Sequence, residues 1–421
     1  MNKISKKSFL LLEKYWPCCL FLLAIIGFIS KSLYNYPIGV MALLGLYKLI
    51  ISPSIMIEDR SLRLFSFAFL CIWFPLLFSL PDAVNAMHSS HTVFPYLRFF
   101  FAGIFIIQEI SKDNDRLTFI TTGIFFIVLF WCLDASFQFM FGVNILGHPY
   151  EIGHITGMFY PRNTISHICS ILSAICFIHI YFNLKQRKWM LISLVPLIFI
   201  ILLSGRRAAW IMLFLSSLGF LWYGFVYTAS RKNFLKLTGG IAFIGLLVIT
   251  TTITFHEPTN ERFNVTLGLF SNDYETIDKA TASRLPLWQT ALTIFKQNPI
   301  NGIGPRGYRH VYTKYSEPDD YWHKLTQTHP HLLILEVMAE TGIIGLLGYL
   351  IIFFPLIILA RQNPAKIELL PFLIPVLVAI FPFNAHMAFY GSIWSSIIWL
   401  LVALYFTKAK LILTFQKTTR V

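Results

Sequence analysis

Residues 201–214 read ILLSGRRAAWIMLF and set two adjacent arginines, Arg206 and Arg207, between two apolar runs. Each run is apolar enough to lie in lipid, and a charge at membrane depth is costly. Such a pair therefore faces a cavity, a partner or a substrate by default. The stretch predicts that two membrane spans meet at this point and that a polar group approaches their junction.

The composition of the chain is that of a polytopic membrane protein. Of the 421 residues, 56% are hydrophobic and 13% are charged, whereas a soluble domain needs a charged surface. The net charge of +14 is spread over short basic clusters between apolar runs. Because these clusters form no stripe on a soluble domain, we expect no nucleic-acid partner. The positive-inside rule accounts for the pattern.

About twelve apolar segments are long enough to cross a hydrocarbon core of about 30 Å, which takes about 20 helical residues. We expect spans near residues 13–30, 34–51, 62–81, 93–110, 117–142, 164–183, 189–205, 207–228, 236–255, 332–360, 366–384 and 386–407. Connections of one parity hold nearly all of the lysines and arginines between spans. This bias predicts that these connections and both termini are cytoplasmic.

Only one connection is long, and it falls on the outer side. The predicted organisation is residues 1–255 as transmembrane helices 1–9, residues 256–331 as a periplasmic loop domain, and residues 332–421 as transmembrane helices 10–12 with a cytoplasmic tail. A loop of this length is the expected place for chemistry, since binding and catalytic residues concentrate on loops that a rigid scaffold positions.

The middle of the loop predicts a short helix followed by a tight turn. Four bulky or apolar residues lie at helical spacing, which indicates an amphipathic helix on the membrane surface or capping the bundle. They are Trp288, Ala291, Leu292 and Phe295. Gly302, Gly304 and Gly307 then form the turn. These glycines resemble a phosphate-binding fingerprint, but such a fingerprint follows a strand in a βαβ unit, which the pattern lacks.

Four arginines on the outer side are candidates for binding an anion such as a phosphorylated lipid headgroup. Arg206 and Arg207 lie on the face that the orientation keeps poor in positive charge, and an arginine fork fits phosphate oxygens bidentately. The simpler alternative is an interfacial pair that reaches lipid phosphates. Arg284 lies at the start of the loop helix, where backbone N–H groups and the helix dipole favour an anion. Arg98 lies near the outer end of the fourth span.

Two histidines, His329 and His331, stand where the loop re-enters the membrane. Pro330 between them biases its predecessor toward an extended conformation, which excludes a metal pair of i,i+4 helix geometry. Histidine, with an unperturbed pKa of about 6.5, is suited to take a proton near neutral pH. Glu340 follows along the helix, and we favour a packing role for it over catalysis.

Three segments together resemble one family. They are SGRRAAW (residues 204–210), SRLPLWQTALTIFKQNPINGIGPRGY (283–308) and THPHLLILEVMAETGIIGLLGY (328–349). The set is similar to the O-antigen ligase and polymerase superfamily, whose members are bacterial inner-membrane glycosyltransferases of the C type. The resemblance implies an all-α polytopic membrane protein with about twelve transmembrane helices and one large periplasmic loop containing short helices.

The resemblance also implies roles for particular residues. Arg207 matches the family's arginine after small polar residues, with Arg206 beside it, and Arg284 matches the loop arginine. His331 matches the second histidine of the family's His-x-His pattern, which is implicated as the general base. Leu332 stands where members usually have asparagine, so His329 remains an alternative base.

The implied activity is that of an O-antigen ligase. Such an enzyme transfers an undecaprenyl-diphosphate-linked glycan to lipid A-core oligosaccharide at the periplasmic face of the bacterial inner membrane, with inversion. No metal or cofactor is expected, because fixed arginines in a water-poor cavity can stabilise the departing diphosphate. An O-antigen polymerase and a protein O-oligosaccharyltransferase are alternatives that use the same donor. A transporter or flippase of lipid-linked sugars is less favoured, since the polar residues lie at one face and no internal repeat is visible.

Overall fold

The computed structural model describes residues 3–184, 186–227, 231–325, 327–362, 366–385 and 387–418. Over these ranges the chain is almost entirely helical, and its only β-structure is a pair of isolated bridges, Val143 to Pro149 and Glu151 to His154. Nine helices in the described ranges are long and apolar enough to cross a membrane, and three shorter apolar helices accompany them. The predicted all-α polytopic fold is confirmed, and this is a multi-pass membrane protein.

The membrane helices fall close to the predicted spans. The long ones are α1 (Lys3–Ile26), α4 (Arg60–Phe78), α5 (Ala86–Ile110), α6 (Asn114–Phe141), α7 (Ile165–Asn183), α9 (Arg207–Tyr227), α10 (Arg231–Phe255), α15 (Leu333–Ile351) continued by α16 (Phe353–Gln362), and α18 (Ser392–Thr418). The shorter ones are α2 (Asn35–Ile51), α8 (Leu194–Leu203) after η3 (Lys188–Ser193), and α17 (Lys366–Ala379).

The start of the last span was predicted wrongly, since it lies at Ser392 rather than at residue 386. The reason is tertiary. The backbone N–H groups of Phe389 and Tyr390 donate to the buried carboxylate of Glu336 in α15, at 2.9 and 3.3 Å. These residues therefore belong to a connection fastened to α15, and the helix begins after it.

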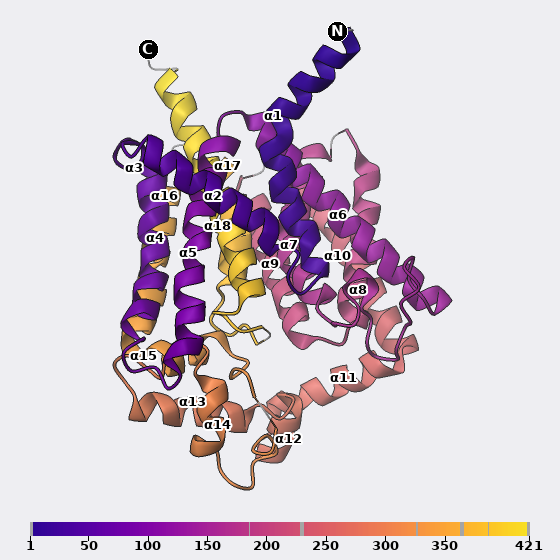
Figure 1. Ribbon diagram of the computed structural model, residues 1–421. Coiled ribbons are helices and arrows are strands. Elements are labelled where there is room, and N and C mark those ends of the chain that lie inside the picture. The colour runs from indigo at the N-terminus through magenta and orange to yellow at the C-terminus, as the bar shows by residue number, and fades with distance from the viewer. Residues whose placement is uncertain are drawn as a thin grey trace.

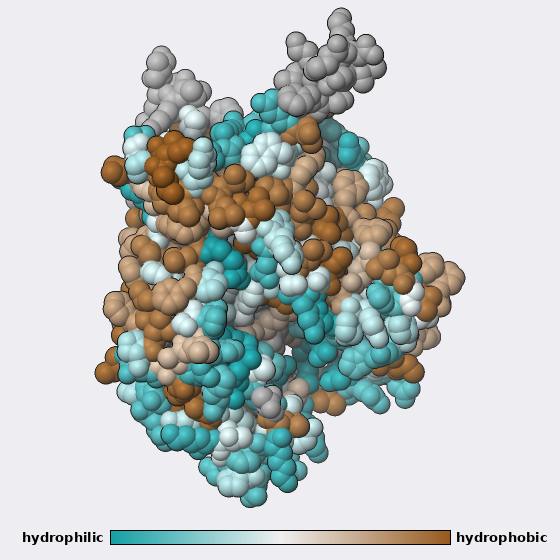
Figure 2. Space-filling view, in the orientation of Figure 1, coloured by the Kyte–Doolittle hydropathy of each residue, from teal (hydrophilic) through white to brown (hydrophobic). Residues whose placement is uncertain are grey.

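Both ends of the chain lie at one end of the helical bundle, and the helices of the long loop lie at the other (Figure 1). The loop helices are α11 (Glu257–Leu267), α12 (Tyr274–Ala280), α13 (Leu285–Gln297) and α14 (Tyr308–Tyr315). Figure 2 shows hydrophobic residues over much of the bundle, hydrophilic residues over the loop helices, and a hollow between the two. The polar loop thus caps one end of an apolar bundle.

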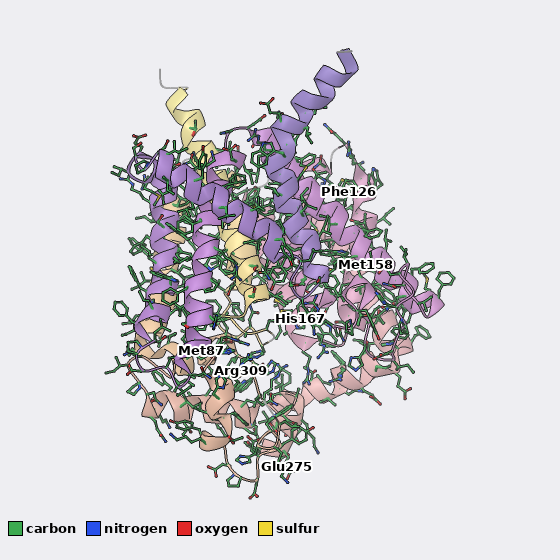
Figure 3. The ribbon with its side chains drawn as sticks, viewed as in Figure 1. Met87, Phe126, Met158, His167, Glu275 and Arg309 are labelled. Carbon is green, nitrogen blue, oxygen red and sulfur yellow. The ribbon has the colours of Figure 1, made fainter. Side chains whose placement is uncertain are left out.

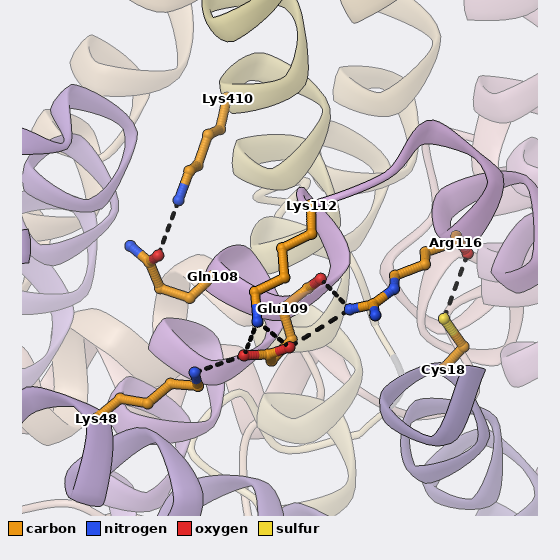
Figure 4. Close-up of polar contacts among 7 residues, drawn as sticks. All are labelled: Cys18, Lys48, Gln108, Glu109, Lys112, Arg116 and Lys410. Carbon is orange, nitrogen blue, oxygen red and sulfur yellow. Dashed lines mark hydrogen bonds and ion pairs between the residues drawn. The ribbon is translucent and has the colours of Figure 1, made fainter. Parts of the chain in front are cut away.

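The end that holds the termini carries ion pairs that connect α2, α5 and α6 (Figure 4). Glu109, near the end of α5, is buried and pairs with Lys48 of α2 and with Lys112, whose Nζ lies 2.8 Å from Oε1. Nη1 of Arg116 in α6 lies 3.4 Å from its Oε2. Because a buried carboxylate needs such partners, this group ties three helix ends together.

The glycine turn after α13 docks on a kink in α15. Gly342 interrupts that helix with φ +63°, and the N–H of Gly304 donates to the carbonyl of Glu340 at 2.9 Å. A Cβ at Gly302 would lie 2.5 Å from the carbonyl carbon of Glu340, and its φ is +66°, so glycine is required there. The turn fastens the loop to a membrane helix.

The predicted loop helix is α13, and its buried face is Leu287, Thr290, Ala291 and Ile294. Of the residues expected on the apolar face, Ala291 is buried but Leu292 is 38% exposed. The i, i+4, i+7 line from Leu287 to Ile294 forms the ridge that packs with α15, which turns Leu292 outward. The helix was predicted correctly and its buried face only in part.

Candidate functional site

The junction of α8 and α9 brings two arginines to the loop end of the bundle. Gly205 turns the chain with φ +61°, and Arg207 is the first residue of α9. Nε of Arg206 and Nη1 of Arg207 are buried and have no hydrogen-bond partner among the described residues. Among the described residues, no carboxylate lies within ion-pair distance of Arg206 or Arg207. Their donors are therefore open to a ligand.

Arg284 comes to the same place from the loop. It stands immediately before the first residue of α13, and its Nη1 donates to the carbonyl of Ala385 at 2.9 Å. Burial, and after it the positive charges of Arg207 and Arg206, lower the pKa of Arg284 to about 10. Because the interaction between charges falls with distance, this effect indicates that Arg284 lies near Arg206 and Arg207. We call Arg206, Arg207 and Arg284 the arginine cluster.

A buried imidazole of the membrane helix α7 connects the arginine cluster to the histidines. Electrostatic interactions link His167 with Arg206, Arg284 and His331. Figure 3 shows His167 at the end of the bundle that faces the loop helices. This residue was not predicted from the sequence. The available signal was an ionisable side chain inside an apolar helix, which indicates a functional site by default.

His329 and His331 lie beside each other at the entrance to α15. Their ring centroids are 3.9 Å apart, and Nδ1 of His329 lies 2.8 Å from Oγ1 of Thr328. His331 has φ +53°, in the left-handed region. His331 thus interacts electrostatically with His167, which interacts in the same way with Arg206 and Arg284.

Arg262 of α11 is a further arginine beside the cluster. A Cβ on Gly205 would lie 3.6 Å from its Cγ, and its charge acts on both Arg206 and Arg207. Its side chain is exposed. No pattern in the sequence singles it out, because α11 has the composition of an ordinary polar helix.

Backbone strain concentrates at this end of the molecule. The non-glycine residues with a left-handed backbone in the described ranges are Ala282, Ser283, Arg306 and His331, with φ of 62°, 55°, 61° and 53°. Each such residue costs about 1–3 kcal/mol and persists where its surroundings enforce it, often at a functional site. Two of them immediately precede Arg284, and one is His331.

Arg98 does not join the arginine cluster. Its Nη2 donates to Oγ of Ser392 at 2.8 Å, and its guanidinium lies 4.4 Å from the ring centroid of Phe99. It lines a separate cavity of about 450 Å³ together with Arg306 and Arg309 of the loop. The reason is helix packing: α5 lies against α2 and α18, whereas α7, α9 and α13 provide the groups around the cluster.

Two buried carboxylates of α15, Glu336 and Glu340, bind the backbone of segments that border the arginine cluster and the cavity lined by Arg98. Glu340 accepts backbone N–H groups of the glycine turn, from Arg306 at 2.7 Å and from Tyr308 at 3.4 Å. Glu336 accepts the two N–H groups of the connection before α18. Glu340 therefore has the structural role that its sequence position favoured. In the sequence, two glutamates four residues apart in an apolar helix already indicate that both side chains need polar partners inside the protein.

An apolar cavity of about 510 Å³ lies between α7, α8, α9 and α10 and reaches α11. Leu202 and Trp210, which line it, flank the two arginines in the sequence, and Phe263 of α11 lines it at the loop end. The cavity therefore extends from the apolar part of the bundle toward the arginine cluster. Over the described residues, no group of three or more His, Cys, Asp or Glu side chains is placed to hold a metal ion.

Residues 191–350 match the family model described as O-Antigen ligase. This segment of the chain is therefore similar to that family. The matched segment contains the arginine cluster, both histidines and the two carboxylates, whereas Arg98 and His167 precede it. The resemblance inferred from the sequence is confirmed over this part of the chain.

Two curated proteins with related descriptions are also similar to this chain. A protein of Rickettsia felis named "Putative polysaccharide ligase" is 28% identical over 177 residues, which cover 37% of this chain and 41% of the relative. A protein of Rickettsia conorii, also described as a putative polysaccharide ligase, matches with the same identity and coverage. The match thus spans less than half the length of each relative.

Proposed function

We propose that this protein is an O-antigen ligase, a glycosyltransferase that moves an undecaprenyl-diphosphate-linked glycan to lipid A-core oligosaccharide. The observation that carries the proposal is the arginine cluster with His331 linked to it, inside the segment that matches the O-Antigen ligase family. Nε of Arg206 and Nη1 of Arg207, which have no hydrogen-bond partner among the described residues, can donate to the oxygens of a diphosphate.

The proposed location is the bacterial inner membrane, with the loop end in the periplasm and both termini in the cytoplasm. Basic residues gather at the end that holds the termini, as Lys48, Lys112 and Arg116 illustrate (Figure 4). The positive-inside rule assigns such an end to the cytoplasm. The arginine cluster then faces the periplasm.

The donor is held in two parts in this proposal. The arginine cluster binds the diphosphate, and the apolar cavity beside it accommodates part of the isoprenoid chain, because burial of apolar surface is favourable. Arg284 is fixed for this role by its hydrogen bond to Ala385. Arg206 and Arg207 are fixed by the start of α9.

The chemical step is a displacement at the anomeric carbon. A hydroxyl oxygen of the acceptor forms the new bond to that carbon while the bond to the diphosphate oxygen breaks, and the diphosphate leaves with the electron pair. His331 takes the hydroxyl proton, with His329 as the alternative base. The arginine cluster stabilises the negative charge that develops on the leaving group. Attack from the opposite side inverts the anomeric configuration.

Lipopolysaccharide from a strain that lacks the protein tests this function. A ligase is required for every glycan length, so its loss should remove the whole ladder of glycan-bearing bands from a gel. A polymerase is required only for chain growth, so its loss would leave a band with a single repeat. The single-repeat band would contradict the ligase assignment and favour a polymerase.

A further inference from the structure

The second cavity, which contains Arg98, is a positively charged chamber separate from the arginine cluster. It lies between α5, the start of α14 and the start of α18. Arg98, Arg306, Arg309, His88, His91 and Ser392 are among its lining residues. Figure 3 shows Arg309 on the side of the loop that faces the bundle. A volume of about 450 Å³ is within the range of small-molecule sites.

The guanidinium groups of this cavity retain unused donors. Nε of Arg98, Nη1 of Arg306 and Nε of Arg309 are buried and lack a hydrogen-bond partner among the described residues. The carboxylate of Glu336 lies 3.9 Å from Nη1 of Arg306, but it already accepts two backbone N–H groups. Gathering three partly buried cations near acids that are already hydrogen-bonded is unfavourable unless an anion also binds.

Electrostatics at Arg309 agree with this geometry. Burial, and then the charge of Arg306, lower its pKa, while Glu340 and Glu336 act in the opposite direction. The pKa is lowered on balance, so the two acids do not offset the combined effect of burial and of Arg306. A bound anion would supply the missing charge.

The neutral lining indicates more than a bare phosphate. Tyr96 and Phe99 present aromatic rings, and Asn35 and Ser392 present an amide and a hydroxyl. Such groups offer apolar contact and directional hydrogen bonds to a polyhydroxylated ring. Arginines beside them suit a sugar that carries a phosphate.

The second cavity and the arginine cluster share a border. The connection between α17 and α18 accepts the hydrogen bond of Arg284 at Ala385, and the same connection lines the second cavity with Tyr390 and Gly391. A molecule in the second cavity therefore lies across this connection from the donor diphosphate. An acceptor must lie next to the bound donor, because its hydroxyl group has to reach the anomeric carbon.

We propose that the second cavity binds a phosphorylated sugar of the acceptor glycolipid and thereby positions the acceptor for transfer. The inference rests on the proposed function, because it names the acceptor's recognition group for that reaction. It assigns Arg98, Arg306 and Arg309 to acceptor binding and leaves the donor to the arginine cluster.

Transfer kinetics of the full-length protein in nanodiscs provide the first test. Two acceptors are compared, a glycolipid with phosphate on its saccharide and the same glycolipid after phosphatase treatment. Arg309→Gln should raise KM for the phosphorylated acceptor about tenfold and leave KM for the donor unchanged, as expected for loss of one charge-assisted hydrogen bond. With the dephosphorylated acceptor, Arg309→Gln and wild type should be equal.

Lys314→Gln is the matched control, because Lys314 lies on the same helix α14, is exposed and does not line the cavity. It should behave as wild type with both acceptors. Equal KM values for Arg309→Gln and wild type with the phosphorylated acceptor would overturn the inference. A rise in donor KM instead would also overturn it, since Arg309 would then serve the diphosphate.

A binding measurement separates this inference from the proposed function. In an Arg207→Gln/Arg284→Gln background the donor site is disabled, so glucose 6-phosphate should bind only at the second cavity. Adding Arg309→Gln should weaken that binding at least tenfold, and inorganic phosphate and glucose should each bind more weakly than glucose 6-phosphate. Binding only to phosphatidic acid in nanodiscs, or no effect of Arg309→Gln, would reject the sugar-phosphate site even if the wild type transfers glycan.

Discussion

At the scale of single residues, His331 joins two properties that can be separated by mutation. It is an imidazole that interacts electrostatically with His167 beside the arginine cluster, and its φ of +53° lies in the left-handed region, where histidine, asparagine and aspartate are enriched over other side chains. Replacing it with alanine would remove the base and also strain the backbone. Asparagine tolerates the conformation, so it removes the base alone.

His331→Asn should therefore fold as wild type and lose transfer by a factor of about 10²–10⁴, the usual contribution of a general base. The measurement is the transfer rate of purified protein at saturating donor and acceptor, with thermal unfolding as the folding control. His329→Asn should reduce the rate much less. The reverse order of effects would assign the base to His329.

Arg284 depends on the shape of its side chain as well as its charge. Lysine keeps the positive charge but lacks the planar fork, so it cannot bind the diphosphate bidentately while it holds the carbonyl of Ala385. Arg284→Lys should lower transfer at least tenfold, and Arg284→Gln more. Lys296→Gln, an exposed change at the end of the same helix α13, is the control and should have no effect. Full activity of Arg284→Lys would argue against a bidentate clamp.

At the scale of elements, the attachment of the loop to α15 positions Arg284 and Arg306. Gly302 lies against the backbone of Glu340 so closely that a Cβ would be 2.5 Å from a carbonyl carbon. The carbonyl carbon of Glu340 belongs to the backbone of α15, so it can move away only if the helix is distorted. The turn, and the helix α13 before it, depend on this contact.

Gly302→Ala should lower the melting temperature by several degrees, because strain at a left-handed glycine and a backbone clash together cost about 1–3 kcal/mol. Thermal unfolding in detergent measures this, and transfer should fall in parallel. Gly39→Ala is the control, since a Cβ at Gly39 in α2 has no neighbour within 4 Å. Equal melting curves for Gly302→Ala and wild type would show that the turn is not a structural contact.

The spans were predictable because hydrophobic length alone decides that a helix crosses the membrane. The start of α18 could not be predicted in this way, because it depends on Glu336 binding the N–H groups of Phe389 and Tyr390. The arginines of the cluster were found from their unusual setting. His167 and the separate position of Arg98 were missed, because spacing along the chain does not tell which helices meet.

At the scale of the whole molecule, the loop end gathers positive charge that the protein itself does not neutralise. The arginine cluster has no carboxylate within ion-pair distance in the described part of the chain. Mutual repulsion of its members makes the empty protein less stable than it would be with an anion bound. The molecule is thus arranged to favour its bound state.

Inorganic diphosphate should consequently raise the melting temperature, and a ligand at 100 times its Kd contributes about 2.7 kcal/mol. The rise should disappear in Arg207→Gln/Arg284→Gln. Inorganic sulfate at equal ionic strength controls for a general salt effect and should stabilise less. An equal shift in the double variant would place the anion elsewhere.

Transfer should also proceed without a divalent cation, since the cluster provides the positive charge that a metal would otherwise supply. A chelator added to the purified, reconstituted protein should leave the rate unchanged, with a metal-dependent glycosyltransferase treated in parallel as the control. Loss of activity that added magnesium or manganese restores would contradict this.

The most direct measurement is a cryo-electron microscopy structure of the full chain in nanodiscs with an undecaprenyl-diphosphate-linked glycan bound. We expect the diphosphate oxygens at hydrogen-bond distance, about 3 Å, from the guanidinium groups of Arg207 and Arg284. The first sugar should face His331. A diphosphate bound away from these three residues, for instance against Arg309 in the second cavity, would contradict the proposed site.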